Sequence, residues 1–184
     1  AGGDRLLARG NWAMFNTIWI SCQEIIDNPT TSETARARLE GSNTCFIDIP
    51  GLNANRWGWT NGPLQPGTYT AELIAAAGQC NVANGTDVGN VVFNYDGSSL
   101  TVTVNAQGTN SETGETYNLE EVHIYAGGQM IPVGPNGDLT VAPGQLGYNS
   151  GALDAELTHT TTINNLSGPI YIATHAVVNG FPVE

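Results

Sequence analysis

From residue 44 to the end of the chain, short runs with strand character are separated by turn residues at regular spacing. Apolar residues that alternate with polar ones predict β-strands with one buried face, and the interruptions predict short connections. Asp96-Gly97 and residues 135–138 indicate tight turns, and we interpret 53–63 as a loop rich in aromatic residues. The expected strands cover residues 44–49, 68–77, 89–94, 99–105, 116–125, 139–141, 157–163 and 169–178.

No stretch within residues 44–180 has the period of a helix, and neither an internal repeat nor a domain boundary interrupts the pattern. Abundant Thr favours strands, while Gly and Asn favour tight turns. We therefore expect an all-β protein, a single-domain, jelly-roll-like β-sandwich over residues 27–184. The one short helix that we expect covers 27–40, where Thr31 or Ser32 can cap its start and Glu33 falls in its first turn.

Residues 1–26 form a separate N-terminal arm in this prediction, because they hold the most apolar segment of the chain, 11–21. Its large side chains fall on both faces of an extended strand, and such a strand must be buried on both sides. They are Trp12, Met14, Phe15, Ile18, Trp19 and Ile20.

Two interpretations of segment 11–21 stay open. It is either an ordinary core strand of the same domain or a strand laid into a groove of the next subunit, where it adds main-chain hydrogen bonds and side-chain anchors. A head-to-tail contact that does not close gives an open filament. The composition of residues 1–10 and the turn-rich stretch 27–32 fit an exchanged arm.

The charge of the chain excludes some classes of binding partner. Charged residues make up 12% of the 184 positions, with five Arg, no Lys and a formal net charge of -12. This chain cannot build the large basic patch that nucleic acid requires, and an anionic membrane surface would repel it. Chemistry that needs a lysine is excluded, and no apolar run reaches the ~18 residues of a membrane span. Low charge and an acidic pI favour a secreted or cell-surface protein that has already been processed.

Three cysteines, Cys22, Cys45 and Cys80, have spacings that match neither a zinc knuckle nor a redox motif. An odd number in an oxidising compartment suggests one disulfide and one remaining thiol. We expect the disulfide between Cys45 and Cys80, with Cys22 left as an alternative partner.

Several phrases of the sequence occur together in a way that resembles a group of functionally uncharacterised, secreted, β-rich microbial proteins. The phrases are TCFID (44–48), RWGWTNG (56–62), AGQC (77–80), TVAPGQ (140–145) and HAVV (175–178). The resemblance covers about residues 44–180 and implies a secreted β domain, but it supplies no reaction. Members of the group often have a cysteine after the last phrase, where this chain has Asn179.

The histidines are weak candidates for chemistry. His123, His159 and His175, with Glu121, could hold a metal, but the chain has no HExxH or His-x-His motif, so structural histidines are favoured. A Gly-x-Ser-x-Gly elbow is absent, and a dyad of Cys80 with His175 has no local signature. We therefore expect no enzyme and assign no catalytic residue.

Calcium suits acidic, loop-rich β structure, because it prefers carboxylate and carbonyl oxygens. No cofactor is required in this prediction, and the alternative to a calcium site is a solvated acidic surface. Asn84 and Asn165 begin glycosylation sequons. The candidate calcium ligands are Asp48, Asp87, Asp96, Asp138, Asp154 and Glu156.

Arg56, Trp57 and Trp59 lie in one loop and can stack on sugar rings if the tryptophans are exposed; the alternative is that one of them plugs the end of the sandwich. Taken together, these features predict a non-enzymatic structural subunit. It would assemble with its own copies into an extracellular filament, tube or matrix through its N-terminal strand. The alternative is a secreted carbohydrate- or surface-binding module that uses the aromatic loop and binds glycans.

Overall fold

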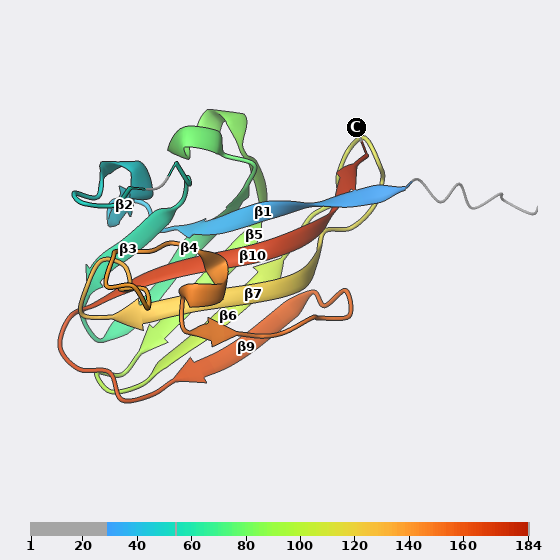
Figure 1. Cartoon of the computed structure of the whole chain (residues 1–184). Coiled ribbons are helices and arrows are strands. Elements are labelled where there is room, and N and C mark those ends of the chain that lie inside the picture. The colour runs from blue at the N-terminus through green and yellow to red at the C-terminus, as the bar shows by residue number, and fades with distance from the viewer. Residues whose placement is uncertain (1–28, 54, 184) are drawn as a thin grey trace, which may run out of the picture.

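In a computed structural model, which describes residues 29–53 and 55–183, every long element is an antiparallel strand (Figure 1). The helical pieces in the described ranges are short 3-10 turns, η1 (Phe46–Asp48), η2 (Gly78–Cys80), η3 (Val82–Asn84) and η4 (Pro143–Gln145). None of them is long or apolar enough to cross a membrane. The strands are β1 (Thr30–Arg38), β2 (Asn43–Cys45), β3 (Trp59–Leu64), β4 (Gly67–Ala75), β5 (Thr86–Tyr95), β6 (Leu100–Ala106), β7 (Asn118–Gly127), β8 (Tyr148–Asn149), β9 (Thr158–Ile163) and β10 (Ile170–Pro182).

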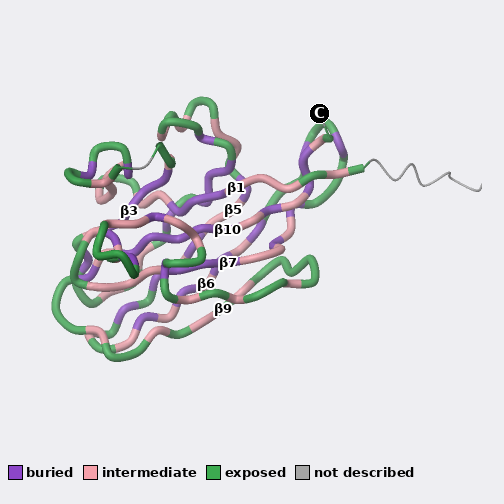
Figure 2. The backbone as a smooth tube through the Cα atoms, viewed as in Figure 1, coloured by how far each residue is buried: buried purple, intermediate pink, exposed green. Residues whose placement is uncertain are grey.

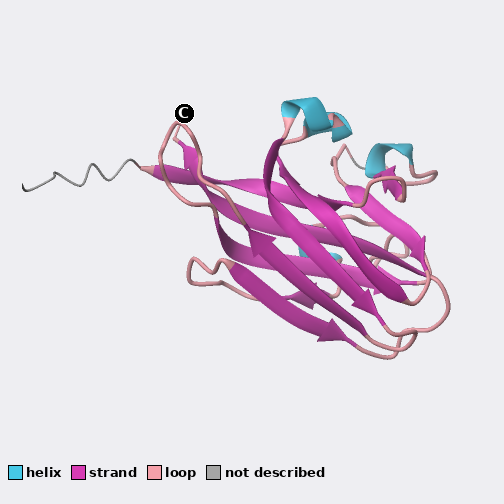
Figure 3. Cartoon of the chain, turned by 180° about the vertical axis from the view of Figure 1, so that it is seen from behind, coloured by secondary structure: helices cyan, strands magenta, loops and turns pink. Residues whose placement is uncertain are grey.

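The strands form one continuous sheet that folds into two layers. Its order is β2-β3-β10-β1-β4-β5-β6-β9, and β7 lies on the other side of β10 and carries β8. Strand β1 pairs with β10 on one side and with β4 on the other, so it joins the front layer to the rear layer of β4, β5, β6 and β9 (Figures 1 and 3). The expected all-β sandwich is confirmed.

The main core lies between the two layers, where alternate residues of both layers are buried. Figure 2 colours the backbone by this burial. In β6, Leu100, Val102 and Val104 are completely buried, while the residues between them face outward. This period of two is the pattern that identified the strands in the sequence. Strands β4, β5, β6, β7, β9 and β10 were all predicted close to their observed bounds.

The predicted helix over 27–40 is wrong, because its described part forms β1. Ala35 and Ala37 point into the core, and Arg36 between them points to the other face. Alanine is small and has a high helix propensity, so this alternation is easily missed in the sequence. Pairing with β10 and β4 decides the conformation instead.

Three further expectations differ from the structure. The run 44–49 divides into the end of β2 and the turn η1, and residues 59–63 of the predicted loop belong to β3. The run 139–141 contributes an isolated bridge between Val133 and Leu139 rather than a strand. The arm residues Trp12, Met14, Phe15, Ile18, Trp19 and Ile20 lie outside the described residues, as does Cys22.

A second apolar cluster covers the outer face of the front layer. Phe46, Ile49, Ile131 and Val141 come from loops and pack on Ala173 of β10. The loops therefore fold down onto the front sheet, and they enclose the polar side chains that stand beside Ala173 on the same face.

Candidate functional site

Three basic side chains form a row across the front layer. Arg36 of β1 is opposite His175 of β10, and His175 is opposite His123 of β7. Neighbours of these residues, such as Ala35 and Val122, face the core, so the row lies on the outer face. Opposite positions on paired strands bring side chains close, and the two imidazole rings have centroids 5.3 Å apart.

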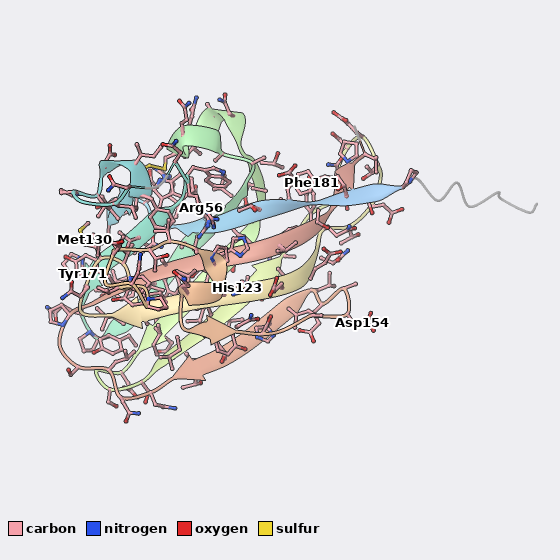
Figure 4. All side chains as sticks on the ribbon, viewed as in Figure 1. Arg56, His123, Met130, Asp154, Tyr171 and Phe181 are labelled. Atoms are coloured by element: carbon pink, nitrogen blue, oxygen red, sulfur yellow. A yellow bond between two sulfur atoms is a disulfide. The ribbon has the colours of Figure 1, made fainter. Side chains whose placement is uncertain are left out.

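A loop that includes residues 55–58 and the turn η4 cover one end of this row. Between them lies a cavity of about 270 Å³, lined by Thr34, Arg36, Asn55, Arg56, Trp57, Pro143 and His175. Arg56 from the loop and His123 from β7 both lie on the side of the front layer that carries the loops (Figure 4). Two of the five arginines of a chain without lysine therefore line this cavity.

Gly58 allows the loop to approach the sheet. Its φ is +140°, and a Cβ at this position would lie 2.6 Å from the Phe46 ring and 3.1 Å from Cδ of Arg36. Its amide donates to Sγ of Cys80, and its carbonyl accepts from the amide of Phe46 at 2.8 Å. Glycine is required here by both the backbone conformation and the close contact.

Arg36 is buried without a counter-charge. It is 3% exposed, and its Nε and Nη1 have no hydrogen-bond partner in the described ranges. Its guanidinium carbon lies 5.3 Å from the centroid of the Phe46 ring, a cation–π distance. Burial, with a smaller contribution from the nearby charge of Arg56, lowers the pKa of Arg36 to about 9. Arg36 is therefore still a cation at neutral pH.

His175 is 6% exposed, and its Nδ1 also has no partner among the residues described. Burial, and then the neighbouring Arg36, His123 and Arg56, lower the pKa of His175 to about 3. At neutral pH it is an uncharged imidazole that can donate one hydrogen bond and accept another.

His123 closes the far end of the row. Its Nε2 lies 3.0 Å from a carboxylate oxygen of Glu121. At one end of the row, Nε2 of His123 is paired with a carboxylate. At the other end, Nε and Nη1 of Arg36 have no hydrogen-bond partner among the described residues, and the cavity lies at this end. This arrangement can bind an anion.

The histidine prediction is corrected in part. The structure brings His123, His175 and Glu121 together, but His159 lies on β9 and bonds to the hydroxyl of Tyr148 at 2.7 Å. In residues 29–53 and 55–183 no group of three His, Cys, Asp or Glu residues could hold a metal ion. Cys80 is in a disulfide, so the thiol dyad with His175 does not exist.

The disulfide joins Cys45 to Cys80, as expected. It lies against Trp59, Ile74 and Ala77 in a small apolar cluster. Trp59 is 2% exposed and meets the half-buried Trp57 edge to face at 5.8 Å between ring centroids. The prediction that Trp57 and Trp59 are both exposed, as a platform for a sugar ring would require, is therefore wrong. Trp59 instead packs in the apolar cluster beside the disulfide. Arg56 and Trp57 remain at the cavity.

The predicted calcium ligands are dispersed. Asp96 and Asp138 each bond within their own turn, and Asp87 accepts from the amide of Gly89 within β5. The amides of Ser98 and Ser99 lower the pKa of Asp96. Glu156 contacts His159, and Asp154 is exposed (Figure 4). Asp48 lies beside the disulfide. Asn84 and Asn165, which begin the sequons, are both exposed.

A second feature of the molecule is the open edge of β9, which pairs only with β6 in the part of the chain that is described. Ala106 donates to the carbonyl of Leu157, so in an antiparallel ladder alternate residues from 157 onward bond to β6. The backbone groups of Thr158, Thr160 and Thr162 consequently point away from the sheet. The register of β9 with β6 is regular, and residues 158–163 contain neither the proline nor the Lys that often protects an edge strand.

The core becomes thin at β9. Its inward-facing residues His159, Thr161 and Ile163 are half-buried, whereas those of β6 are completely buried. Tyr148, Leu153 and Leu166 are also only partly buried around the core. An additional strand at this edge would cover these apolar side chains.

The outer face of the rear layer carries almost no charge. Its acidic residues are Glu72, which forms an ion pair with Arg38 at 3.0 Å, and Asp87 at the start of β5. Hydroxyl groups pair across the strands, as between Thr103 and Thr160. By register the face comprises Thr68, Thr70, Glu72, Asn90, Val92, Asn94, Thr101, Thr103, Asn105, Thr158, Thr160 and Thr162.

The chain matches no protein-family model, no curated protein and no solved structure. A function therefore has to be argued from these two features, the basic cavity and the open edge.

Proposed function

We propose that the protein is a non-enzymatic, extracellular structural subunit that assembles with its own copies into a filament, tube or matrix. Segment 11–21 of one copy adds as a strand to the open edge of β9 in the next copy. The observation that carries this proposal is the unprotected edge of β9, beside a core that thins there.

The chemistry of the two partners is complementary. The outward backbone groups of Thr158, Thr160 and Thr162 supply donors and acceptors for a new strand. Trp12, Met14, Ile18 and Ile20 share one side of an extended segment 11–21. Packed inward, that side covers the half-buried rim around Ile163.

The two partner surfaces lie apart on the molecule. Figure 1 shows β9 at the lower border of the molecule and β1, which follows the arm in the chain, above β10 and β7 and away from β9. A contact between two different surfaces is heterologous, and repetition gives an open polymer unless the ring closes. On the rear face at this edge, β6 and β9 themselves present Thr and Asn outward, so copies of an acidic chain can approach there with little direct repulsion at the contact.

An extracellular site is supported by the disulfide and by the composition. Disulfides persist in oxidising compartments and are rare in the cytosol. No cofactor enters this proposal, and calcium is retained as an optional stabiliser of the assembly.

The test is negative-stain electron microscopy of four proteins: the full chain, a deletion of residues 1–21, Thr160→Pro and Thr160→Ala. Proline removes one outward N–H and leaves the β6 ladder intact, since residue 160 does not bond to β6. Alanine loses the same hydroxyl contact with Thr103 but keeps the N–H. We expect polymers from the full chain and Thr160→Ala, and folded monomers from the other two.

A truncated protein that still polymerises contradicts the role of the arm. If Thr160→Pro still polymerises, the arm does not dock on the edge of β9. Circular dichroism of each variant separates loss of assembly from loss of folding.

A carbohydrate- or surface-binding module is the second candidate, because Arg56 and Trp57 line the basic cavity. Dispersed monomers of the full chain, with and without millimolar calcium, would favour this candidate over assembly.

A further inference from the structure

The basic cavity is not used by the proposed assembly, and its charge distribution points to a ligand. We propose that this cavity binds a small carboxylate, which the guanidinium groups of Arg36 and Arg56 hold beside the ring of Trp57. The proposal stands on the geometry of the front layer and does not depend on self-assembly.

The first argument is the missing counter-charge. Buried charges are normally paired, because removal of a charge from water is costly. Arg36 is 3% exposed, yet its Nε and Nη1 have no partner in the described ranges. Its guanidinium lies over the face of the Phe46 ring. An anion in the cavity would supply the missing partner.

The second argument is the composition of the cavity wall. None of the seven residues that line it is acidic, although the whole chain has a formal net charge of -12. Arg56 lies close enough to Arg36 to depress its pKa, so two like charges converge on one space. Convergent cations without a carboxylate between them are typical of an anion site.

The third argument concerns the chemical class of the anion. A guanidinium presents its N–H groups in a planar fork that matches the two oxygens of a carboxylate. The neutral imidazole of His175 and the hydroxyl of Thr34 also line the space and can donate to an oxygen. Trp57 and Pro143 form an apolar wall, which suits the carbon skeleton that carries the carboxylate.

The size of the cavity limits the ligand. Pockets that bind drug-sized ligands have volumes of roughly 300–1,000 Å³. The volume of this cavity is about 270 Å³. It therefore fits a carboxylate with a few carbon atoms or the carboxylate end of a larger molecule such as an acidic sugar. A free acid and an acidic sugar share the same recognition chemistry, and the experiment separates them.

The experiment is isothermal titration calorimetry of the full chain at pH 7 and constant ionic strength. The probes are sodium acetate, sodium glucuronate, glucose and sodium phosphate. Glucose keeps a sugar ring without the carboxylate. We expect acetate and glucuronate to bind and glucose to give no signal. If glucuronate binds more tightly than acetate, the ligand class is an acidic sugar. If acetate binds more tightly, the ligand class is a small free acid. Glucose binding as well as glucuronate, or phosphate binding more tightly than both carboxylates, overturns the proposal.

Variants assign the binding to the cavity. Arg36→Met should weaken carboxylate binding at least tenfold, and Arg56→Gln, which changes an exposed residue, should weaken it less. Arg38→Met is the matched control on the same strand, since Arg38 is already paired with Glu72. It should leave the affinity unchanged.

Arg36→Met should also raise the midpoint of thermal unfolding in the absence of ligand, because a buried charge without a partner is removed. A variant that is destabilised and still binds carboxylate shows that Arg36 is structural, and the proposal then fails. If Arg36→Met does not fold, an unchanged affinity in Arg56→Gln overturns it.

Discussion

His175 is a base that its surroundings keep uncharged. Arg36 from β1, His123 from β7 and Arg56 from the loop before β3 all face it, and each of these opposes a positive charge on His175. Its pKa of about 3 in the folded protein lies below the ordinary value of 6.5. Between these two values the unfolded chain takes up a proton that the folded chain does not.

Stability should therefore fall as the pH drops below 6.5. Between pH 7 and pH 5 we expect His175 to contribute a loss of about 2 kcal/mol in the free energy of unfolding. His175→Gln should abolish this contribution, because glutamine does not titrate. Urea unfolding at the two pH values measures the difference. Parallel curves for wild type and His175→Gln would refute this account.

Single residues were the hardest features to predict. Trp59 and Trp57 are two positions apart in the sequence, yet one is fully buried and the other lines a cavity. Arg36 was placed on a helix, so its position beside His175 was not foreseen. The alternation of Ala35 and Ala37 around Arg36 was the signal that could have found it. Burial of this kind depends on which loops fold over a face, and periodicity does not report that.

At the scale of elements, the Cys45–Cys80 disulfide fixes the short strand β2 to the turn η2. It closes a loop with a sequence separation of 35. In the chain-entropy model a loop of this length stabilises the folded state by about 4 kcal/mol. It also anchors the amide of Gly58 and with it the loop that covers the cavity.

The double variant Cys45→Ser/Cys80→Ser should lose about 4 kcal/mol of unfolding free energy, measured by urea titration. Dithiothreitol should destabilise the wild type by a similar amount and have no effect on the double variant. Cys22→Ser is the control and should still respond to the reductant. A wild type that is insensitive to the reductant would show that the disulfide contributes little.

The elements that were predicted correctly are those with strong alternation. The hairpin of β5 and β6 around Asp96-Gly97 is an example, because its turn chemistry and its apolar period agree. Elements that are short, or whose sequence is polar and rich in turn residues, were not predicted. Strand β3 contains Gly62 and Pro63, which favour a loop locally, but pairing with β2 and β10 makes it a strand.

At the scale of the whole molecule, the formal net charge of -12 opposes contact between copies. The Debye length falls from about 30 Å at 0.01 M salt to about 8 Å at 0.15 M. Assembly through the arm and β9 should therefore accelerate as NaCl is added, with a shorter lag in light scattering. Calcium chloride and magnesium chloride at equal ionic strength form a matched pair, and a faster reaction with calcium alone would point to a specific calcium site. A lag that does not change with salt contradicts the screening argument.

The fold class was readable from the sequence because periodicity, turns and composition agree over most of the chain. The basic cavity could not be read from the sequence, because it joins residues from β1, β10, η4 and the loop with residues 55–57, which are far apart in sequence. Arg56 and Trp57 were singled out as a binding loop, but their partners were identified only through the register of the strands.

The double pairing of β1 has a mechanical consequence. This strand is held by β10 along most of its length and by β4 at its far end. A force applied to the N-terminal end of β1 along the strand axis would load these hydrogen bonds in shear, so that many must break together rather than one after another. Such a strand resists tension far better than one that is peeled from an edge. A polymer pulled through its arms would therefore transmit the load into both layers of each subunit.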